Sequence, residues 1–227
     1  MHRFTGLASG TQIDTLTCWP DGTCTAIGAY RGVRIFSVTR TRGTWGKLRQ
    51  VPGLAALPGA TPGGASISAL SCPSPGNCTI GGVYHRKPDG YQVFTAGQKH
   101  GTWGRARALA GPAALNTGRR ASLTGLVCFS AGTCTAAGDY AIKHSKYTAD
   151  AIFTAAEKNG TWRTPERVPG SRVNLGTCAE LLALSCGAPG NCSIGGSYQI
   201  KTAPEPFLDT EKNGTWAKAR PLRGIQP

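Results

Sequence analysis

The sequence predicts an all-β fold: a four-bladed β-propeller of four-stranded antiparallel blades, with one disulfide inside each blade. Three observations lead to this prediction. One unit is repeated four times, eight cysteines form four evenly spaced pairs, and the 227 residues include 32 glycines and 15 prolines. So many turn-forming residues argue against long helices. Hydrophobic residues make up 40% and charged residues 16%, which excludes a disordered polyelectrolyte. No apolar run reaches the length of a membrane span.

Two independent sets of landmarks define the repeat. The first cysteines of the four Cys-x5-Cys pairs are 54, 56 and 58 residues apart, and four tryptophans follow at intervals of 58, 59 and 54 residues. The pairs are Cys18/Cys24, Cys72/Cys78, Cys128/Cys134 and Cys186/Cys192, and the tryptophans are Trp45, Trp103, Trp162 and Trp216. We expect a single propeller domain over residues 1–227, with repeat units at about 13–53, 67–111, 123–170 and 181–224.

Each unit contains four strand-like runs, A to D, separated by turn residues. Run A ends in Leu-x-Cys, and a five-residue loop containing glycine leads into run B, Thr/Ser-x-x-Gly-x-Tyr. Run C carries an apolar pair such as Ile152-Phe153, and a Gly-Thr-Trp turn opens run D. Glycine suits this turn because tight hairpins need a positive φ. Four antiparallel strands per repeat are typical of a propeller blade, although a fragment of a larger propeller, or a dimer that completes one, remains the alternative.

The paired cysteines flank the loop between runs A and B, so they should face each other across a hairpin. We expect four disulfides rather than metal sites, because none of His2, His85, His100 and His144 recurs with the pairs. Cys178 has no partner at this spacing. Disulfides indicate an oxidising compartment, so we expect a secreted protein. No signal peptide precedes Thr5, and we therefore expect the leader to have been removed.

The repeats resemble a tandem Cys-x5-Cys, Gly-Thr-Trp repeat of secreted actinobacterial proteins, and the resemblance covers nearly the whole chain. They are similar to the propeller lectin subunits of the toxin particles called umbrella toxins. This resemblance implies a propeller that serves as a binding module. It further implies a targeting role within a larger secreted complex, with a carrier protein as the partner.

The residues that vary between the units are the candidates for ligand binding. In a propeller, the A–B and C–D turns share one face, and the B–C and D–A loops share the other. The first set is uniform here, whereas the second differs in length and content, and unlike loops on a rigid scaffold commonly form binding sites. The candidates are His85, Asp89, Asn116, His144, Tyr147, Arg31, Arg34, Arg86, Arg119 and Arg120. The alternative interpretation is a set of solvated loops rich in arginine.

The composition leaves three function classes. Lectin-like recognition of a cell-surface glycan or envelope polymer ranks first. The net charge of +14 also suits a binder of polyanions such as nucleic acid or teichoic-type chains, but no nucleic-acid-binding motif accompanies the charge. A glycan-active enzyme ranks last, since only Asp139, near His144, stands out as a catalytic candidate. We therefore expect no enzyme, no cofactor and no metal, with nucleic acid disfavoured as a partner.

Overall fold

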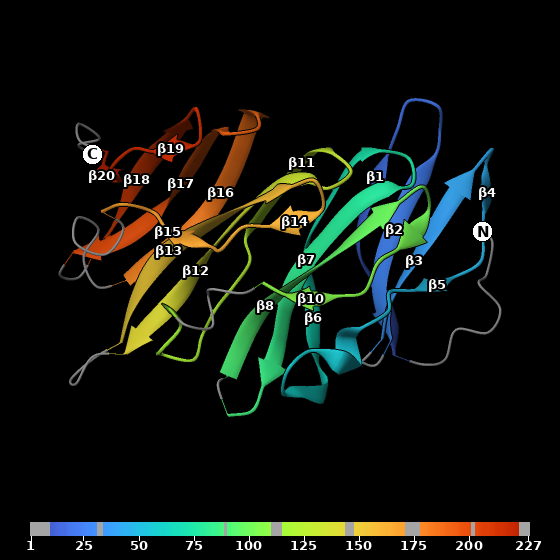
Figure 1. Ribbon diagram of the computed structural model, residues 1–227, viewed down its shortest axis with the longest axis horizontal. Coiled ribbons are helices and arrows are strands. Elements are labelled where there is room, and N and C mark those ends of the chain that lie inside the picture. The colour runs from blue at the N-terminus through green and yellow to red at the C-terminus, as the bar shows by residue number, and fades with distance from the viewer. Residues whose placement is uncertain are drawn as a thin grey trace.

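A computed structural model describes residues 10–30, 34–88, 90–109, 115–143, 148–170, 178–200 and 203–222. This part of the chain holds twenty strands and a single short 3-10 helix, η1 (Leu54–Ala56). The prediction of an all-β fold with very little helix is therefore confirmed. The strands group into four antiparallel sheets, which follow one another in chain order and are called blades 1 to 4 (Figure 1).

The strand bounds repeat from blade to blade. Blade 1 contains β1 (Thr11–Cys18), β2 (Cys24–Tyr30), β3 (Arg34–Thr41), β4 (Thr44–Trp45) and β5 (Arg49–Gln50). Blade 2 contains β6 (Ala60–Ser74), β7 (Asn77–Arg86), β8 (Gly90–Lys99), β9 (Thr102–Trp103) and β10 (Arg107–Ala108). Blade 3 contains β11 (Gly125–Ser130), β12 (Thr133–Lys143), β13 (Thr148–Lys158), β14 (Thr161–Trp162) and β15 (Glu166–Arg167). Blade 4 contains β16 (Cys178–Ala188), β17 (Asn191–Ile200), β18 (Ala203–Lys212), β19 (Thr215–Trp216) and β20 (Arg220–Pro221).

Within each blade, three long strands pair in the order A, B, C, and a fourth, interrupted strand pairs with the outer side of strand C. This strand, the predicted strand D, consists of two short pieces, such as β14 and β15, that both pair with the same C strand. All four predicted disulfides are present, Cys18–Cys24, Cys72–Cys78, Cys128–Cys134 and Cys186–Cys192, each joining strands A and B. The side chain of Cys178 lies outside the described residues.

The disulfide-bridged loops and the Gly-Thr-Trp turns meet at one end of the blades, which we call the bridged end. Asn159 and Gly160 both have positive φ, 53° and 77°, as a two-residue type I′ hairpin requires. The Gly160 amide donates a hydrogen bond of 2.9 Å to the carbonyl oxygen of Gly132 in the A–B loop. The same backbone hydrogen bond runs from the Gly101 amide to the Gly76 carbonyl oxygen and from the Gly214 amide to the Gly190 carbonyl oxygen. The Asn-Gly-Thr sequences thus serve the hairpins.

Neighbouring blades pack face to face through apolar side chains. Three clusters of buried residues lie at the three junctions, and each draws residues from both blades. The repeated tyrosines Tyr84, Tyr140 and Tyr198 are buried in these clusters, so they serve packing. Polar contacts cross the junctions too: the Trp103 indole nitrogen donates a 2.7 Å hydrogen bond to Ser37 Oγ of blade 1.

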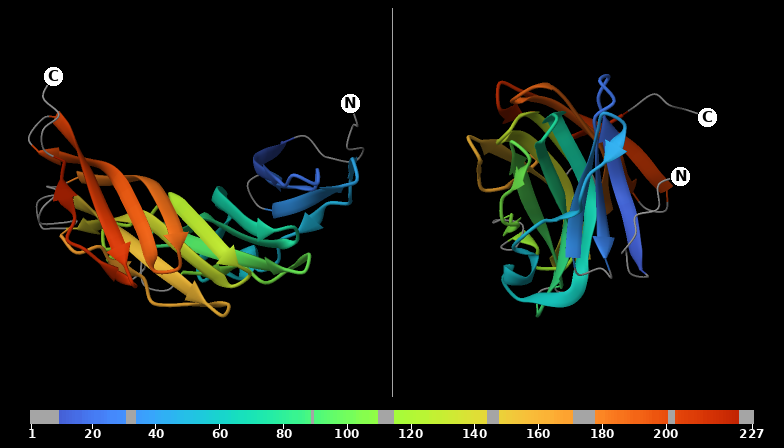
Figure 2. Two further views of the ribbon diagram at one scale, coloured as in Figure 1. Left: turned by 90° about the horizontal axis from the view of Figure 1, so that it is seen from above. Right: turned by 90° about the vertical axis from the view of Figure 1, so that its right-hand side faces the viewer.

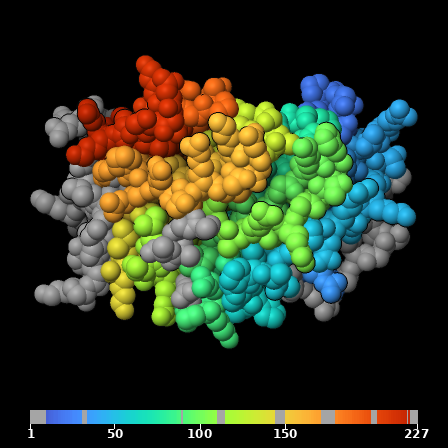
Figure 3. All heavy atoms as spheres, viewed as in Figure 1, coloured from blue at the N-terminus to red at the C-terminus, as the bar shows by residue number. Residues whose placement is uncertain are grey.

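The four blades follow an open arc. Blade 1 and blade 4 lie at its opposite ends (Figures 1 and 2). The space-filling view likewise shows blade 1 in blue and blade 4 in red at opposite ends of the molecule (Figure 3). Within the described residues, no helix is long and apolar enough to cross a membrane. The four predicted blades, each with one disulfide, are thus confirmed, and in this chain they form an open arc (Figure 2).

Candidate functional site: the loop end of blades 2 to 4

The B–C and D–A loops meet at the end of the blades opposite the disulfides, which we call the loop end. The segment 115–120, which connects blade 2 to blade 3, is held between the two blades by backbone hydrogen bonds. The Tyr91 amide of blade 2 donates to the carbonyl oxygen of Arg119 at 3.1 Å, and the Ala141 amide of blade 3 donates to that of Arg120 at 2.7 Å. The segment is thus fixed to two rigid strands.

Asn116 anchors this segment. The side chain is 3% exposed, and both of its amide atoms are bonded. Its Nδ2 donates to the carbonyl oxygen of Tyr91 at 2.9 Å, and its Oδ1 accepts from the Arg120 amide at 2.7 Å. A buried side chain with its hydrogen bonds satisfied holds the loop in place. Asn116, one of the predicted ligand-binding residues, therefore holds segment 115–120 in place and does not present its own side chain at the surface.

Three other predicted residues lie around the same segment. His85, at the end of β7, comes from the B–C side of blade 2, and Arg119 and Arg120 come from the D–A segment. The fourth, Arg86, lies beside Gly59 in the connection between blades 1 and 2. His85 Nδ1 lies 3.1 Å from Thr61 Oγ1, and its ring meets the exposed ring of Tyr91 edge-on at 5.4 Å. Arg119 is exposed at a positive φ of 65°. An exposed aromatic ring with arginines and a histidine nearby forms a mixed apolar and cationic surface.

The remaining predicted residues do not join this surface. Arg34 is exposed at the start of β3 in blade 1, one blade away from the segment. Arg31, Asp89, His144 and Tyr147 lie outside the described residues.

A cleft of about 870 Å³ opens at the loop end between blades 3 and 4. Blade 3 contributes Arg120, Ser122, Thr124, Asp139 and Asp150, and blade 4 contributes Glu180, Leu182, Ser197, Gln199 and Pro204 among others. Arg120 borders the cleft and belongs to the segment described above, so segment 115–120 runs from Tyr91 to the cleft.

Three carboxyl groups and one arginine dominate the electrostatics of this cleft. Arg120 pairs with both oxygens of Asp150 at 2.5 Å. Burial raises the pKa of Asp139 above its ordinary value, and the nearby charges of Asp150 and Glu180 raise it further. The 2.7 Å hydrogen bond from Ser122 Oγ and the charge of Arg120 oppose this rise. The cleft therefore offers hydrogen-bond acceptors, a cation and one carboxyl with a raised pKa.

Tyr91, Asp150 and Glu180 were not predicted as site residues. Each comes from a different strand and none recurs between repeats, so only the fold brings them to the site. Asp139 did carry a signal in the sequence, because the other repeats have Ala29, Val83 and Ser197 at its position. Among the residues that the structure describes, no three histidine, cysteine, aspartate or glutamate side chains come together as a metal site.

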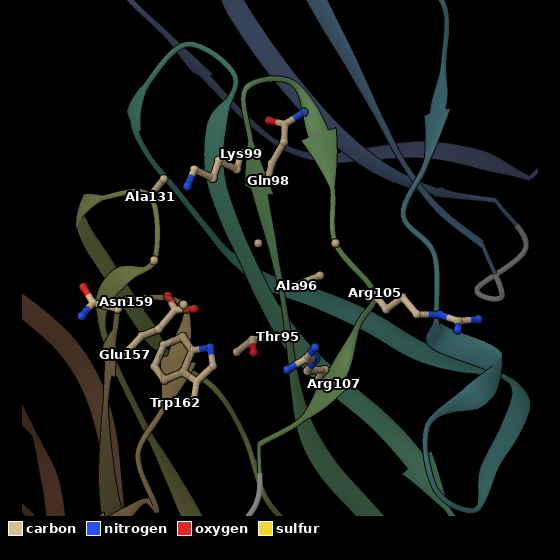
Figure 4. A pocket seen from close by; sticks show the side chains of 14 residues that line it. Thr95, Ala96, Gln98, Lys99, Arg105, Arg107, Ala131, Glu157, Asn159 and Trp162 are labelled. Atoms are coloured by element: carbon tan, nitrogen blue, oxygen red, sulfur yellow. The ribbon is translucent and has the colours of Figure 1, made fainter.

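A second kind of cleft recurs at the bridged end of each junction. The cleft between blades 2 and 3, about 450 Å³, places Glu157 and Trp162 of blade 3 opposite Thr95 and Arg107 of blade 2 (Figure 4). Glu157 is buried and burial raises its pKa. Gln98 and Glu211 occupy the corresponding positions, each opposite the tryptophan of its own blade. These clefts are similar to one another because the repeated segments form them. The loop-end cleft instead combines residues that no other junction has in the part of the chain that the structure describes.

No protein-family model and no curated protein matches this sequence. Among solved structures, the chain is similar to the crystal structure of the GH74 xyloglucanase from Xanthomonas campestris, with 16% sequence identity and a TM-score of 0.49. The match covers 92% of this chain and 29% of that chain. This chain thus spans less than a third of the length of the xyloglucanase.

Proposed function

We propose that this protein is a secreted, lectin-like binding module that recognises a cell-surface glycan or envelope polymer at the loop end of blades 2 to 4. One observation carries the proposal: segment 115–120 is bonded to Tyr91, whose ring is exposed, and contributes Arg120 to the 870 Å³ cleft. Sugars need a flat apolar face beside polar groups that pair with hydroxyls, and this surface offers both. The four disulfides support an extracellular setting.

The carboxylates in the cleft favour a glycan over a polyanion. Asp150 and Glu180 would repel the phosphates of nucleic acid or teichoic chains, whereas carboxylate oxygens are good acceptors for sugar hydroxyls. Arg119 lies outside the cleft, next to the Tyr91 backbone, whose amide bonds the Arg119 carbonyl oxygen. A glycan with occasional negative charge, bound with its hydroxyls toward the cleft, would satisfy both parts of the surface.

A glycan array, followed by titration of the strongest ligand at low and high salt, tests the proposal. We expect Tyr91→Ala to lower the affinity about tenfold through the lost stacking surface. We expect Arg119→Ala to lower it at least about fivefold. Arg42→Ala is the matched control, because Arg42 is also exposed at a positive φ but lies at the bridged end.

Salt dependence separates the two binding classes. A lectin keeps its affinity for a neutral glycan from low to high salt, whereas a polyanion binder loses affinity steeply as counterions compete. An empty glycan array together with retention on heparin or DNA at low salt only would contradict the proposal.

A glycan-active enzyme is the second candidate, supported by the unlike environments of Asp139 and Asp150. One carboxyl has a pKa raised by burial and the other is paired with arginine, and such pairs can divide acid and base roles. Incubation of the bound glycan with protein, followed by mass spectrometry, decides between the candidates. Cleavage products that disappear in Asp139→Asn would make the protein an enzyme, and an intact glycan would support the binding module.

The resemblance to lectin subunits of umbrella toxin particles supports a role as the targeting subunit of a larger secreted assembly. In that case the carrier protein would bind outside the loop end, leaving the ligand surface open. Purification of the protein from its natural culture medium tests this, since a targeting subunit would elute as a large particle. Elution as a free chain or small oligomer would contradict it.

A further inference from the structure

The two ends of the arc expose the two halves of an interface that is buried three times inside the chain. We call the side of a blade that faces the preceding blade its leading face, and the opposite side its trailing face. Within the chain, Leu123 on the leading face of blade 3 packs against Gly81 on the trailing face of blade 2; a Cβ at Gly81 would lie 2.1 Å from Leu123 Cδ2. The leading face of blade 1 and the trailing face of blade 4 have no such neighbour in the described residues.

The leading face of blade 1 carries apolar side chains whose counterparts are buried. Ile13 in blade 1 and Leu181 in blade 4 are equivalent positions, because each lies opposite the repeated glycine of strand B, Gly28 or Gly196. Ile13 is nevertheless 50% exposed, whereas Leu181 is 1% exposed. Leu16 is 55% exposed, whereas its counterpart Leu126 is 8% exposed. Leu48, after the Gly-Thr-Trp turn, is exposed in the same way on this face. This face is therefore built for a junction.

The trailing face of blade 4 shows the complementary pattern. Leu222 and Val168 are equivalent positions, because the backbone amide of each donates a hydrogen bond to strand C of its own blade. Val168 is fully buried, whereas Leu222 is 38% exposed. Leu208 is 53% exposed beside Gly195. The other three blades have a buried serine or threonine at the Leu208 position: Ser37, Thr95 and Thr154. Blade 4 thus has the apolar Leu208 where the other blades have a hydroxyl side chain. Without a partner on this face, the Leu208 side chain would be exposed to water.

These five side chains account for most of the large apolar residues that are exposed in the described part of the chain; only Tyr91 and Leu182 lie elsewhere. The concentration of exposed apolar side chains on two faces indicates that a partner covers both faces. One chain carries a leading face and a trailing face of the same repeating junction, so a second copy supplies both missing neighbours.

We propose that two copies of this chain associate head to tail, with the leading face of blade 1 in one copy packed on the trailing face of blade 4 in the other. Two such junctions close two arcs into one ring of eight blades. The arc supports closure, because its two ends turn toward the same side (Figure 2). A head-to-tail interface gives a closed ring when the rotation per subunit fits, and otherwise a filament.

Light scattering coupled to size-exclusion chromatography tests the pairing. We expect twice the 23.6 kDa mass of one chain. Ile13→Asp and Leu208→Asp should each reduce the mass to that of one chain, because every junction contains Ile13 of one copy and Leu208 of the other. Leu182→Asp is the matched control. Leu182 is exposed, as Ile13 and Leu208 are, but it lies in the cleft between blades 3 and 4. The Leu182→Asp variant should therefore keep the mass of two chains.

Mixing the two variants tests the direction of pairing. In a mixed pair, one junction carries both substitutions and the other is unchanged on both sides, so the mixture should again form pairs. A single-chain mass for the unchanged protein at about 100 μM would overturn the proposal, since a working apolar interface is populated at that concentration. Loss of pairing in Ile13→Asp but not in Leu208→Asp would also overturn it, because it would indicate like faces pairing with each other.

Discussion

The bridged end and the loop end of the blades are built from the same strands but in opposite ways. At the bridged end, every blade has a disulfide across its A–B loop, and in blades 2 to 4 a Gly–Gly hydrogen bond ties that loop to the C–D turn. At the loop end, segment 115–120 has contacts that no other junction shares within the described residues. Repetition at one end stabilises the scaffold, and variation at the other end leaves residues free for recognition.

The largest expected effect is at the bridged end. A Cβ at Gly132 would lie 2.6 Å from the backbone nitrogen of Gly160, and Gly132 has a φ of 80°. Gly132→Ala should lower the free energy of unfolding by about 3 kcal/mol, from strain at positive φ plus this overlap. Gly22→Ala is the control, because Gly22 has the same conformation with no atom near its Cβ. Chemical denaturation should show a smaller loss for Gly22→Ala, and equal losses would contradict the role of the Gly–Gly contact.

Removal of one disulfide should have the next largest effect. Cys128→Ala with Cys134→Ala opens a loop of sequence separation 6, which should lower the free energy of unfolding by about 2 kcal/mol on the chain-entropy estimate. The loop end lies at the other end of these strands, so ligand affinity should stay unchanged. A loss of affinity in a variant that remains folded would show that the two ends are coupled.

Two asparagines offer a direct comparison of the ends. Asn77 links the A–B loop of blade 2 to its C–D turn through the His100 amide at 3.2 Å, while Asn116 links segment 115–120 to Tyr91 and is more deeply buried. Asn116→Ala should destabilise the protein by about 1–2 kcal/mol because it leaves a buried donor and acceptor unpaired. Asn77→Ala should cost less. Calorimetry gives the stabilities, and only Asn116→Ala should also weaken ligand binding.

The smallest expected effect depends on pH. Burial raises the pKa of Glu157 in the folded protein, so the folded state holds this proton more tightly than the unfolded chain does. The contribution to stability is therefore full below the pKa of the unfolded chain and falls as pH rises through the folded value. Glu157→Gln introduces the side chain that blade 2 has at the equivalent position, Gln98, and removes this loss of stability at high pH.

The measurement is the melting temperature at pH 4.5 and 7.5. Glu157→Gln should gain over the unchanged protein more at pH 7.5 than at pH 4.5. Glu166→Gln, at an exposed position in the same blade, is the control and should show no such difference. A gain that is the same at both pH values would mean that the substitution acts through packing.

Features that repeat in the sequence were predictable, and those that depend on how blades meet were not. The spacing of Cys128 and Cys134 predicted their bond, since strands A and B of a hairpin place such residues opposite each other. His85, Arg119 and Arg120 were predicted as loop residues, and the structure brings them to one surface. Tyr91 and Glu180 carried no signal, because their roles arise only when segment 115–120 and blade 4 take their places beside them.

The open arc was likewise beyond the sequence pattern. How two blades meet depends on side chains that come from both of them, such as Leu123 against Gly81, and the repeat pattern does not describe these contacts. The count of repeats therefore predicted the number of blades but not whether one chain closes the ring. The exposed Ile13 and Leu208 became informative only after their buried counterparts were known.

The most direct test of ligand recognition at the loop end is a map of amide chemical shifts with and without a glycan bound. We expect the largest changes at Tyr91, at segment 115–120 and in strand β16 beside the cleft. We expect almost none at the bridged end, in residues 73–77 and 100–103. Large changes at the bridged end with an unaltered loop end would contradict recognition at the loop end, because the uniform clefts near Glu157 would then be the binding sites.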